Sequence, residues 1–224
     1  MNILALETST EFCSIALTLN SDISHQEQHV SNTHSELILS MIDDLLKKSN
    51  LSPQQINGIA FGEGPGSFTG LRIACGVAQG LAFAMSIPVV GVSTLKAVAA
   101  RAKSAKVIVA LDARMGEIYH AAFEQLNDEE WSTVHSGSLC TPENAPLLTN
   151  SGWVGCGSGF AIFKDELCKR YGESVCEIRS ELYPRAKEVA ELALPIFMRG
   201  EGLPASGAIP CYIRNKVALK ESER

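Results

Sequence analysis

Residues 2–19 read NILALETSTEFCSIALTL, and this stretch decides the fold. Two apolar runs, 2–7 and 12–19, flank a short polar turn, which is the signature of a β-hairpin. The same order returns in the second half of the chain, where residues 106–112 and 117–124 flank another polar turn. Such an internal echo predicts two lobes built from one template.

The segments around the two hairpins predict alternating strands and helices. In the first half we expect a strand at 23–30, a helix at 34–48, strands at 57–62 and 88–92, and helices at 67–85 and 94–103. In the second half we expect strands near 132–139 and 153–156, helices near 160–171 and 184–199, and a loop over 200–210. The pattern is that of an α/β protein with an N-terminal lobe over 1–104 and a C-terminal lobe over 105–224.

Several residues mark expected helix starts. Thr33 and Glu36 fit a capping box at the start of the helix 34–48, and Ser67 fits the N-cap of the helix that follows the glycine-rich loop. His34 is expected to be a surface residue of the first turn.

The composition is that of a packed globular protein. Hydrophobic residues make up 46% of the 224 residues and charged residues 20%, which excludes a disordered chain. The formal net charge of −6 opposes unaided binding to a phosphate backbone, which depends on clustered Lys and Arg. The first residues lack the basic start of a signal peptide, and we read no apolar run as long enough to span a bilayer. We therefore expect a cytoplasmic protein that does not contact membranes.

Neither the cysteines nor the histidines predict a metal site. The seven cysteines include no Cys-x-x-Cys pair, so we interpret them as reduced packing residues. His25 and His29 lie in a predicted strand, where a spacing of four residues separates them by about 13 Å, too far for one ion.

The glycine-rich run from Gly62 to Gly70 resembles a phosphate-binding loop only superficially. It lacks the lysine of a P-loop, does not match G-x-G-x-x-G, and places Glu63 beside the would-be phosphate. We expect its glycines to allow positive φ angles and close backbone approach instead.

The helix that begins at Ser67 is apolar nearly all round, so we expect it to pack on two partners. Small residues recur every four positions in two rows, Gly70-Ala74-Ala78 and Gly76-Gly80, and small residues let another helix approach closely. The preceding helix carries an apolar stripe, and the two helices together could form half of a four-helix interface. The residues predicted for this partner interface are Leu37, Ile38, Met41, Ile42, Leu45, Leu71, Ala74, Cys75, Ala78 and Leu81.

The alternative is that these helices are buried wholly within their own domain. The two interpretations differ for Ala78→Arg: at an interface, this substitution weakens association while leaving the monomer folded.

A weak nucleotide site is a second candidate. Glu7 and Asp112 end equivalent strands of the two halves, where carboxylates can hold magnesium with nucleotide phosphates, and Thr8 and Ser9 could supply hydroxyls. Against it, the first turn lacks a glycine that would bring amides to a phosphate, and we expect Arg114 to pair with Glu117. We find no nucleophile beside a histidine that could activate it, so we predict no catalytic residues.

Several motifs together resemble the bacterial TsaB (YeaZ) family over essentially the whole chain. They are residues 3–10 (ILALETST), 34–36 (HSE), 62–72 (GEGPGSFTGLR), 91–95 (GVSTL), 112–117 (DARMGE) and 210–214 (PCYIR). The resemblance implies a duplicated fold of the actin, sugar-kinase and Hsp70 type. It also implies a role in making N6-threonylcarbamoyladenosine (t6A) at position 37 of tRNAs that read ANN codons.

In that system, the resemblance implies, the TsaB-like chain is not the enzyme. It pairs with TsaD, a metal-carrying paralogue that performs the transfer, and with the ATPase TsaE, while TsaC-type enzymes supply threonylcarbamoyl-AMP. The complex uses ATP and magnesium and contacts tRNA, and the chain alone forms a homodimer. The positions that match TsaD's metal-binding His-x-x-x-His pair hold Thr94 and Val98 here, which cannot bind a metal as histidines do.

Three rival functions stay open at this point. One is a nucleotide-dependent phosphotransferase that uses Glu7 and Asp112, the second is a peptidase that acts on its partner, and the third is a homodimer with no heteromeric role.

Overall fold

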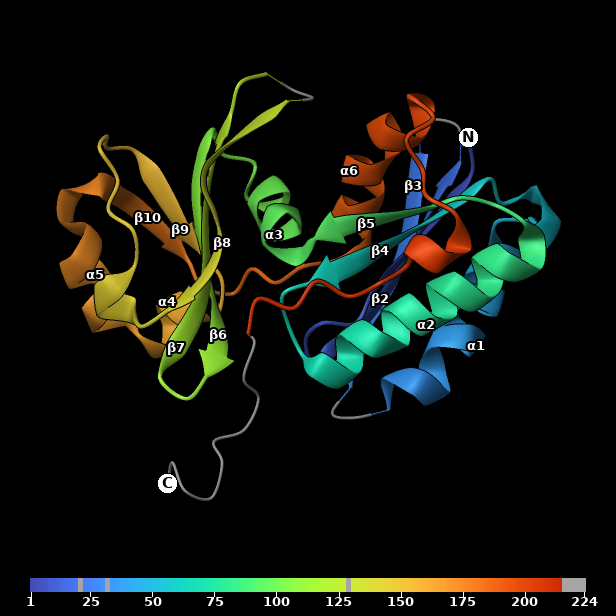
Figure 1. Cartoon of the computed structure of the whole chain (residues 1–224), viewed down its shortest axis with the longest axis horizontal. Coiled ribbons are helices and arrows are strands. Elements are labelled where there is room, and N and C mark those ends of the chain that lie inside the picture. Colours follow the sequence, from blue (N-terminus) through green and yellow to red (C-terminus); the bar gives the residue numbers. More distant parts are fainter. Residues whose placement is uncertain (20–21, 31–32, 128–129, 215–224) are drawn as a thin grey trace.

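The computed structural model describes residues 1–19, 22–30, 33–127 and 130–214. Its two lobes each contain a five-stranded sheet (Figure 1). The first sheet consists of β1 (Ile3–Glu7), β2 (Phe12–Leu19), β3 (Asp22–His29), β4 (Gly58–Gly64) and β5 (Val89–Ser93). The second consists of β6 (Lys106–Arg114), β7 (Glu117–Gln125), β8 (Trp131–Cys140), β9 (Trp153–Cys156) and β10 (Val175–Arg179).

Six α-helices among the described residues connect and cover the sheets. They are α1 (His34–Lys48), α2 (Phe68–Met85), α3 (Thr94–Ala102), α4 (Gly159–Ile162), α5 (Lys164–Tyr171) and α6 (Ala186–Met198). A break at Phe163 divides the single helix predicted for 160–171 into α4 and α5.

The two sheets share one topology. Their strand orders are β3-β2-β1-β4-β5 and β8-β7-β6-β9-β10. In each, the central strand pairs antiparallel with its hairpin partner and parallel with the strand that follows the next connection. The predicted duplication is therefore confirmed. β10 was not predicted, because its short, half-exposed sequence Val175-Cys176-Glu177-Ile178-Arg179 lacks a clear apolar alternation.

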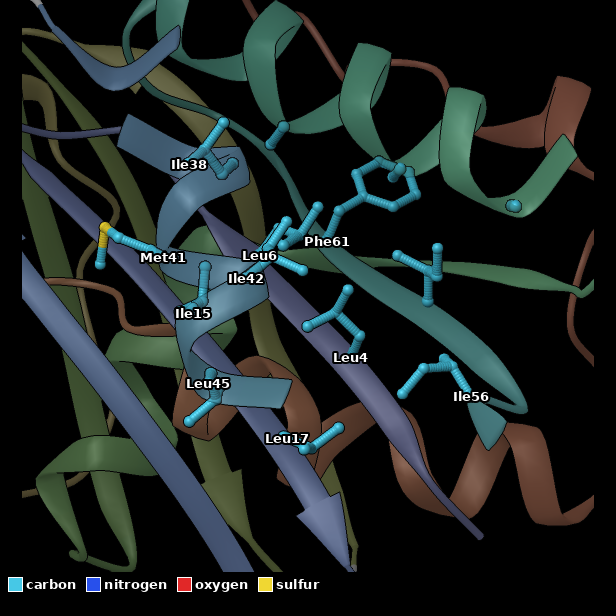
Figure 2. Packing of buried hydrophobic residues seen from close by; sticks show 14 of the residues in the cluster. Leu4, Leu6, Ile15, Leu17, Ile38, Met41, Ile42, Leu45, Ile56 and Phe61 are labelled. Carbon is cyan, nitrogen blue, oxygen red and sulfur yellow. The ribbon is translucent and has the colours of Figure 1, made fainter. Parts of the chain in front are cut away.

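The first sheet is covered on both faces because β1 alternates between two cores. Leu4 and Leu6 point towards α1 and α2, together with aliphatic residues of β2 and β4, as Figure 2 shows. Ile3 and Ala5 belong to the opposite core, under α6. Alternate residues of a strand point to opposite faces, so a continuous apolar run is what a strand buried on both sides requires.

The last helix of each lobe packs against the sheet of the other lobe. α3 follows β5 but buries Leu95, Val98 and Ala102 in the core of the second sheet. α6 follows β10 but lies on the first sheet, with its alanines against the small residues of β1 and β2. The predicted division at residue 104 is therefore wrong for α6, which packs with the N-terminal lobe. Residues 215–224 lie outside the described residues.

The start of α1 differs from the prediction. Thr33 occupies the N-cap position, but its side chain makes no capping hydrogen bond, and its carbonyl accepts from the amides of Glu36 and Leu37 instead. The predicted capping box is thus wrong. His34 was predicted to lie on the surface, but it is 7% exposed, with its Nε2 2.9 Å from the Thr10 carbonyl oxygen. The first turn of α1 packs over the β1–β2 turn, which buries it.

α2 is a long and strongly apolar helix. By length and composition alone it could cross a membrane, with a mean hydropathy of 1.3 over its 18 residues. The expectation that no apolar run is long enough to span a bilayer is therefore wrong for α2. Its inner side packs along β4 and contributes to the core of the first lobe, and an apolar core helix passes the same test.

Candidate functional site: an interlobe cleft and the outer face of α2

A cleft of about 940 Å³ lies between the two lobes. Its first wall comes from the β1–β2 turn and the start of α2, including Ser9 and Gly66. Its second wall comes from the β6–β7 turn, including Asp112 and Met115, and residues 211–214 also line it. The duplicated fold therefore brings the two hairpin turns that the sequence singled out to opposite sides of one cleft.

Glu7 is not among the residues that line this cleft. It is 1% exposed, and its Oε1 accepts a hydrogen bond from the Ser9 amide at 2.6 Å while Oε2 has no partner among the described residues. Burial raises its pKa to about 7, against hydrogen bonds from Ser9 and Thr8 that lower it. A carboxyl group that is enclosed and half protonated near neutral pH is a poor magnesium ligand.

The neighbouring hydroxyls are also enclosed. The Thr8 hydroxyl is fully buried and donates to the Gly70 carbonyl at 2.7 Å, which fixes the β1–β2 turn to the first turn of α2. Ser9 is 4% exposed, and its carbonyl accepts from the Ser67 amide at 2.8 Å. Thr8 serves packing, and of the two only Ser9 borders the cleft.

Asp112 does border the cleft, but its carboxylate is already paired. Its Oδ1 accepts from the Arg114 amide at 2.9 Å, and its Oδ2 lies 3.2 Å from the Arg114 guanidinium. The predicted Arg114–Glu117 pair is wrong, because Glu117 pairs with Arg214 at 2.7 Å. The structure thus places Asp112 and Ser9 on the cleft, encloses Glu7 and Thr8, and does not assemble the four into one site.

The glycine-rich run serves close packing, as predicted. A Cβ at Gly62 would collide with the Glu7 carboxylate, and one at Gly70 would collide with the Thr8 carbonyl. A Cβ at Gly66 would come within 2.6 Å of the Ser9 Cβ, and Gly64 has a φ of +123°. The loop is glycine-rich because the β1–β2 turn and α2 meet across it without room for side chains.

Thr94 and Val98 are the positions that the sequence resemblance aligns with a metal-binding histidine pair. Both are fully buried: the Thr94 hydroxyl donates to the Pro65 carbonyl at 2.5 Å, and Val98 lies in the core of the second lobe. Neither side chain is open to a ligand.

The residues predicted for the partner interface mostly face the core of this chain. Ile38, Met41, Ile42 and Leu45 of α1 are at most 8% exposed and pack over β1 and β2 (Figure 2). On α2, the inward residues are Leu71, Ala74, Cys75 and Ala78, each at most 4% exposed. Leu37 and Leu81 are half-buried against the same core. The interface prediction is therefore corrected: the apolar stripes mark the sides of α1 and α2 that cover the sheet, because a core-facing stripe and an interface stripe have the same periodicity.

The surface left exposed on α2 comes from the other small-residue row. We define the outer face of α2 as the exposed residues Arg72, Gly76, Gln79, Gly80, Phe83 and Ala84, with half-buried Ile73 and Val77 at its edge. Phe83 is 80% exposed, and a Cβ at Gly76 or Gly80 would meet nothing within 4 Å. The expectation that one side of this helix packs on its own sheet is confirmed, and the other side is open, with Phe83 and the two glycines beside the polar side chains of Arg72 and Gln79.

The Gly70-Ala74-Ala78 row is buried in this chain, and the Gly76-Gly80 row is exposed. The sequence shows the Gly76-Gly80 spacing as well, but the larger aliphatic residues placed the predicted partner interface on the other side of the helix. Gly76 and Gly80 have no side chain, so they add nothing to a hydrophobic core. Small residues at this spacing are typical of surfaces on which another helix packs closely.

Comparison with known proteins shows what this chain is similar to. The family model described as TsaD, tRNA N6-adenosine threonylcarbamoyltransferase, matches residues 19–195. The tRNA threonylcarbamoyladenosine biosynthesis protein TsaB of Escherichia coli K12 is 37% identical over 99% of this chain and 98% of its own length. The protein of that name from Haemophilus influenzae is 35% identical over 99% and 97%. A solved structure of YeaZ from Pseudomonas aeruginosa, 36% identical, has a TM-score of 0.87 and covers 94% of this chain and 99% of that one.

Proposed function

This chain belongs to the TsaB (YeaZ) family and has its duplicated actin/sugar-kinase/Hsp70-like fold, and on that premise we propose that it is a non-catalytic subunit of a tRNA-modifying complex. Its relatives are named as t6A biosynthesis proteins. The complex forms t6A at position 37 of tRNAs that read ANN codons, and it works in the cytoplasm. In it, this chain binds and orders a TsaD-like transferase subunit.

The single observation that carries this proposal is the open outer face of α2. Phe83 is 80% exposed, and Gly76 and Gly80 leave the helix backbone accessible between half-buried aliphatic residues. Exposed apolar faces of this kind lower their free energy when a partner covers them, and two glycines one turn apart allow a partner helix to approach closely.

The kind of partner follows from the family model. The TsaD description matches 19–195, a range that includes α1 and α2, and we therefore expect a TsaD chain to have a related fold with an equivalent pair of helices. Two such pairs can face one another as a four-helix contact about a pseudo-two-fold axis. The same face can pair with a second copy of this chain when the paralogue is absent, which accounts for a homodimer in isolation.

The absence of a catalytic role is supported by the state of the cleft groups. Glu7 and Thr8 are enclosed, Asp112 is paired with Arg114, and Thr94 and Val98, which the resemblance aligns with a metal-binding pair, are buried. We therefore place the transfer chemistry, and the use of ATP and magnesium, on the TsaD-like subunit and a TsaE-like ATPase. tRNA binds through the complex, because the net charge of −6 disfavours direct binding by this chain.

The test is Gly80→Arg, with affinity for the TsaD-like subunit measured by titration calorimetry. Gly80 is open to solvent and helical, so arginine fits without disturbing the fold and even favours the helix. Burying this unpaired charge in the interface should cost about 3 kcal/mol, which lowers affinity roughly 150-fold. Glu166→Arg, at an exposed position of α5, is the matched control and should bind as the wild type does. Equal affinities for the two variants would rule out the outer face of α2 as the binding surface.

A nucleotide-dependent enzyme is the competing interpretation. It requires that the isolated chain bind Mg-ATP tightly and at one equivalent, with Asp112→Asn abolishing the binding. We expect calorimetry of the isolated chain to give no such binding, since the Asp112 carboxylate already accepts from the Arg114 amide and lies 3.2 Å from its guanidinium.

A further inference from the structure

The C-terminal segment runs from the first lobe to the second across the mouth of the cleft. Leu203 begins it with two backbone hydrogen bonds to Val89 of 2.8 Å each, which cover the edge of β5. The segment then runs past α2 to the second lobe and ends beside β6, as the red trace in Figure 1 shows. Its last described residues, 211–214, line the cleft.

Two contacts fasten this segment to the first lobe. The Cys211 amide donates to the Glu63 carbonyl at 2.7 Å, and a Cβ at Gly64 would come within 2.6 Å of the Cys211 carbonyl oxygen. Gly64 is thus needed for this close approach. Next, the Arg72 side chain of α2 donates from Nε to the Tyr212 hydroxyl at 2.9 Å.

The following two residues contact the second lobe. Ile213 lies over Gly137 of β8, where a Cβ would come within 3.1 Å of the Ile213 Cδ1. Arg214 pairs with Glu117 at 2.7 Å and donates to the Ala113 carbonyl at 3.0 Å. The Arg214 and Glu117 side chains are only 15% and 29% exposed, so solvent screens this pair less than it screens a surface ion pair.

The other connections between the lobes leave room for movement. The chain crosses between lobes at residues 103–105 and 180–185, and the second crossing is stacked on the first lobe through Tyr183 and Phe12, whose ring centroids lie 3.9 Å apart. Two such crossings next to the packed helices α3 and α6 can serve as a hinge. The start of α3 joins the two cleft walls beside this hinge, since the Thr94 hydroxyl donates to the Pro65 carbonyl and Leu95 packs with Leu111. Away from α3, Tyr212 and Arg214 lie on a described segment that contacts both walls and can therefore set how far the cleft opens.

We propose that residues 211–214 are a clasp that holds the interlobe cleft closed, with Arg72–Tyr212 as its attachment to the first lobe and Arg214–Glu117 as its attachment to the second. Releasing the clasp opens the cleft and exposes buried residues that line it, among them Leu111 and Ala113. This proposal concerns the isolated chain, so it stands or falls independently of the partner proposed above.

Hydrogen exchange of the full-length protein, followed by mass spectrometry, tests the clasp. Arg214→Ala should speed amide exchange about tenfold on both cleft walls, at 65–71 and at 113–117, because a charge-assisted tie between them is lost. Exchange in β1 and β4 should not change. Glu117→Gln, made on the opposite lobe, should reproduce the pattern, and Tyr212→Phe should speed exchange at 65–71 by removing the acceptor for Arg72.

Arg199→Ala is the matched control. Arg199 pairs with Glu201 at 2.9 Å in the same part of the chain, but this pair is exposed and joins neighbouring residues of one lobe. Its loss should leave both cleft walls at the wild-type rate. The clasp is refuted if Arg214→Ala leaves the walls unchanged, or if it speeds exchange by the same factor in β1 and β4, which would indicate a general loss of stability.

Discussion

At the scale of single residues, Glu7 combines a conspicuous position with an unfavourable environment. It ends the central strand of the first lobe, and burial raises its pKa from 4.5 to about 7. Below pH 4.5 both the folded and the unfolded chain bind this proton. Between 4.5 and 7 the unfolded chain releases it while the folded chain keeps it, so the free energy of unfolding falls as the pH rises. Above pH 7 the full cost of about 3 kcal/mol applies.

Glu7→Gln should therefore stabilise the protein selectively at alkaline pH. The amide keeps an oxygen for the Ser9 amide and carries no charge. We expect the difference in Tm between variant and wild type to grow by roughly 10 °C between pH 4.5 and pH 8, as measured by circular dichroism. Glu11→Gln, at an exposed position of the same turn, should show no such trend. A difference for Glu7→Gln that stays constant with pH would mean that Glu7 is not buried as a proton-binding group.

His120 shifts stability in the opposite direction. It is fully buried on β7, neither ring nitrogen has a hydrogen-bond partner among the described residues, and the His135 ring lies 6.1 Å away. Burial, and then the charge of His135, lower its pKa from 6.5 to about 4. The folded chain thus resists a proton that the unfolded chain accepts, and the free energy of unfolding falls as the pH drops from 6.5 towards 4.

His120→Phe should remove this acid sensitivity, because the phenyl ring fills a similar space and cannot be protonated. Urea unfolding at pH 7 and at pH 4.5 measures the effect: the variant should lose up to about 3 kcal/mol less than the wild type on acidification. His25→Gln, on an exposed strand, serves as the control. An identical loss in His120→Phe and wild type would exclude His120 as the cause. In the wild type the two effects partly cancel. As the pH falls, the contribution of Glu7 to the free energy of unfolding rises over much of the range in which the contribution of His120 decreases.

At the scale of elements, substitutions in the buried and in the exposed row of small residues on α2 should affect the stability of the monomer differently. Ala78 is fully buried, so Ala78→Arg forces a charge into the core and should unfold or strongly destabilise the monomer, lowering Tm by 10 °C or more. This reverses the expectation drawn from the sequence, that the monomer stays folded. Gly80→Arg, two residues away and open to solvent, should leave Tm unchanged or slightly raised. A normal Tm for Ala78→Arg would contradict the inward orientation of this row.

The elements that could be predicted from sequence are those whose pattern has one interpretation. The hairpin β1–β2 and its copy β6–β7 are such cases, because the apolar run, polar turn and second run repeat. The interface residues could not be predicted correctly, because a stripe such as Ile38-Met41-Ile42-Leu45 has the same period whether it meets a sheet or a partner. The position of α6 could not be predicted either, because its alanines could pack equally well on either of two similar sheets.

For the candidate site, the sequence located both cleft walls but not the pairing of their charges. Glu7 ends β1 as predicted, whereas Asp112 lies two residues before the end of the equivalent strand β6. Whether each faces the cleft depends on what packs above it: the Ser9 amide and Gly62 enclose Glu7, while Asp112 borders the cleft. Arg214 reaches Glu117 from 97 residues away along the chain, and no local pattern reveals such a pair.

At the scale of the whole molecule, duplication explains the division of roles. Two copies of one template create a cleft between them, and each copy lends its last helix to the other, so the lobes are joined through α3 and α6. In this chain Glu7 is enclosed and Asp112 lies beside Arg114, while the outer face of α2 is left open. The free surface of the molecule is therefore suited to binding another chain.

The central claim is that this chain works by binding a TsaD-like subunit through the outer face of α2. The most direct measurement is the molar mass, by light scattering after size exclusion with Mg-ATP present, of this chain, the subunit, and their equimolar mixture. We expect a single peak at the heterodimer mass for the wild type and separate components for Gly80→Arg. Separate peaks for the wild type, or a heterodimer peak that Gly80→Arg leaves intact, would contradict the account.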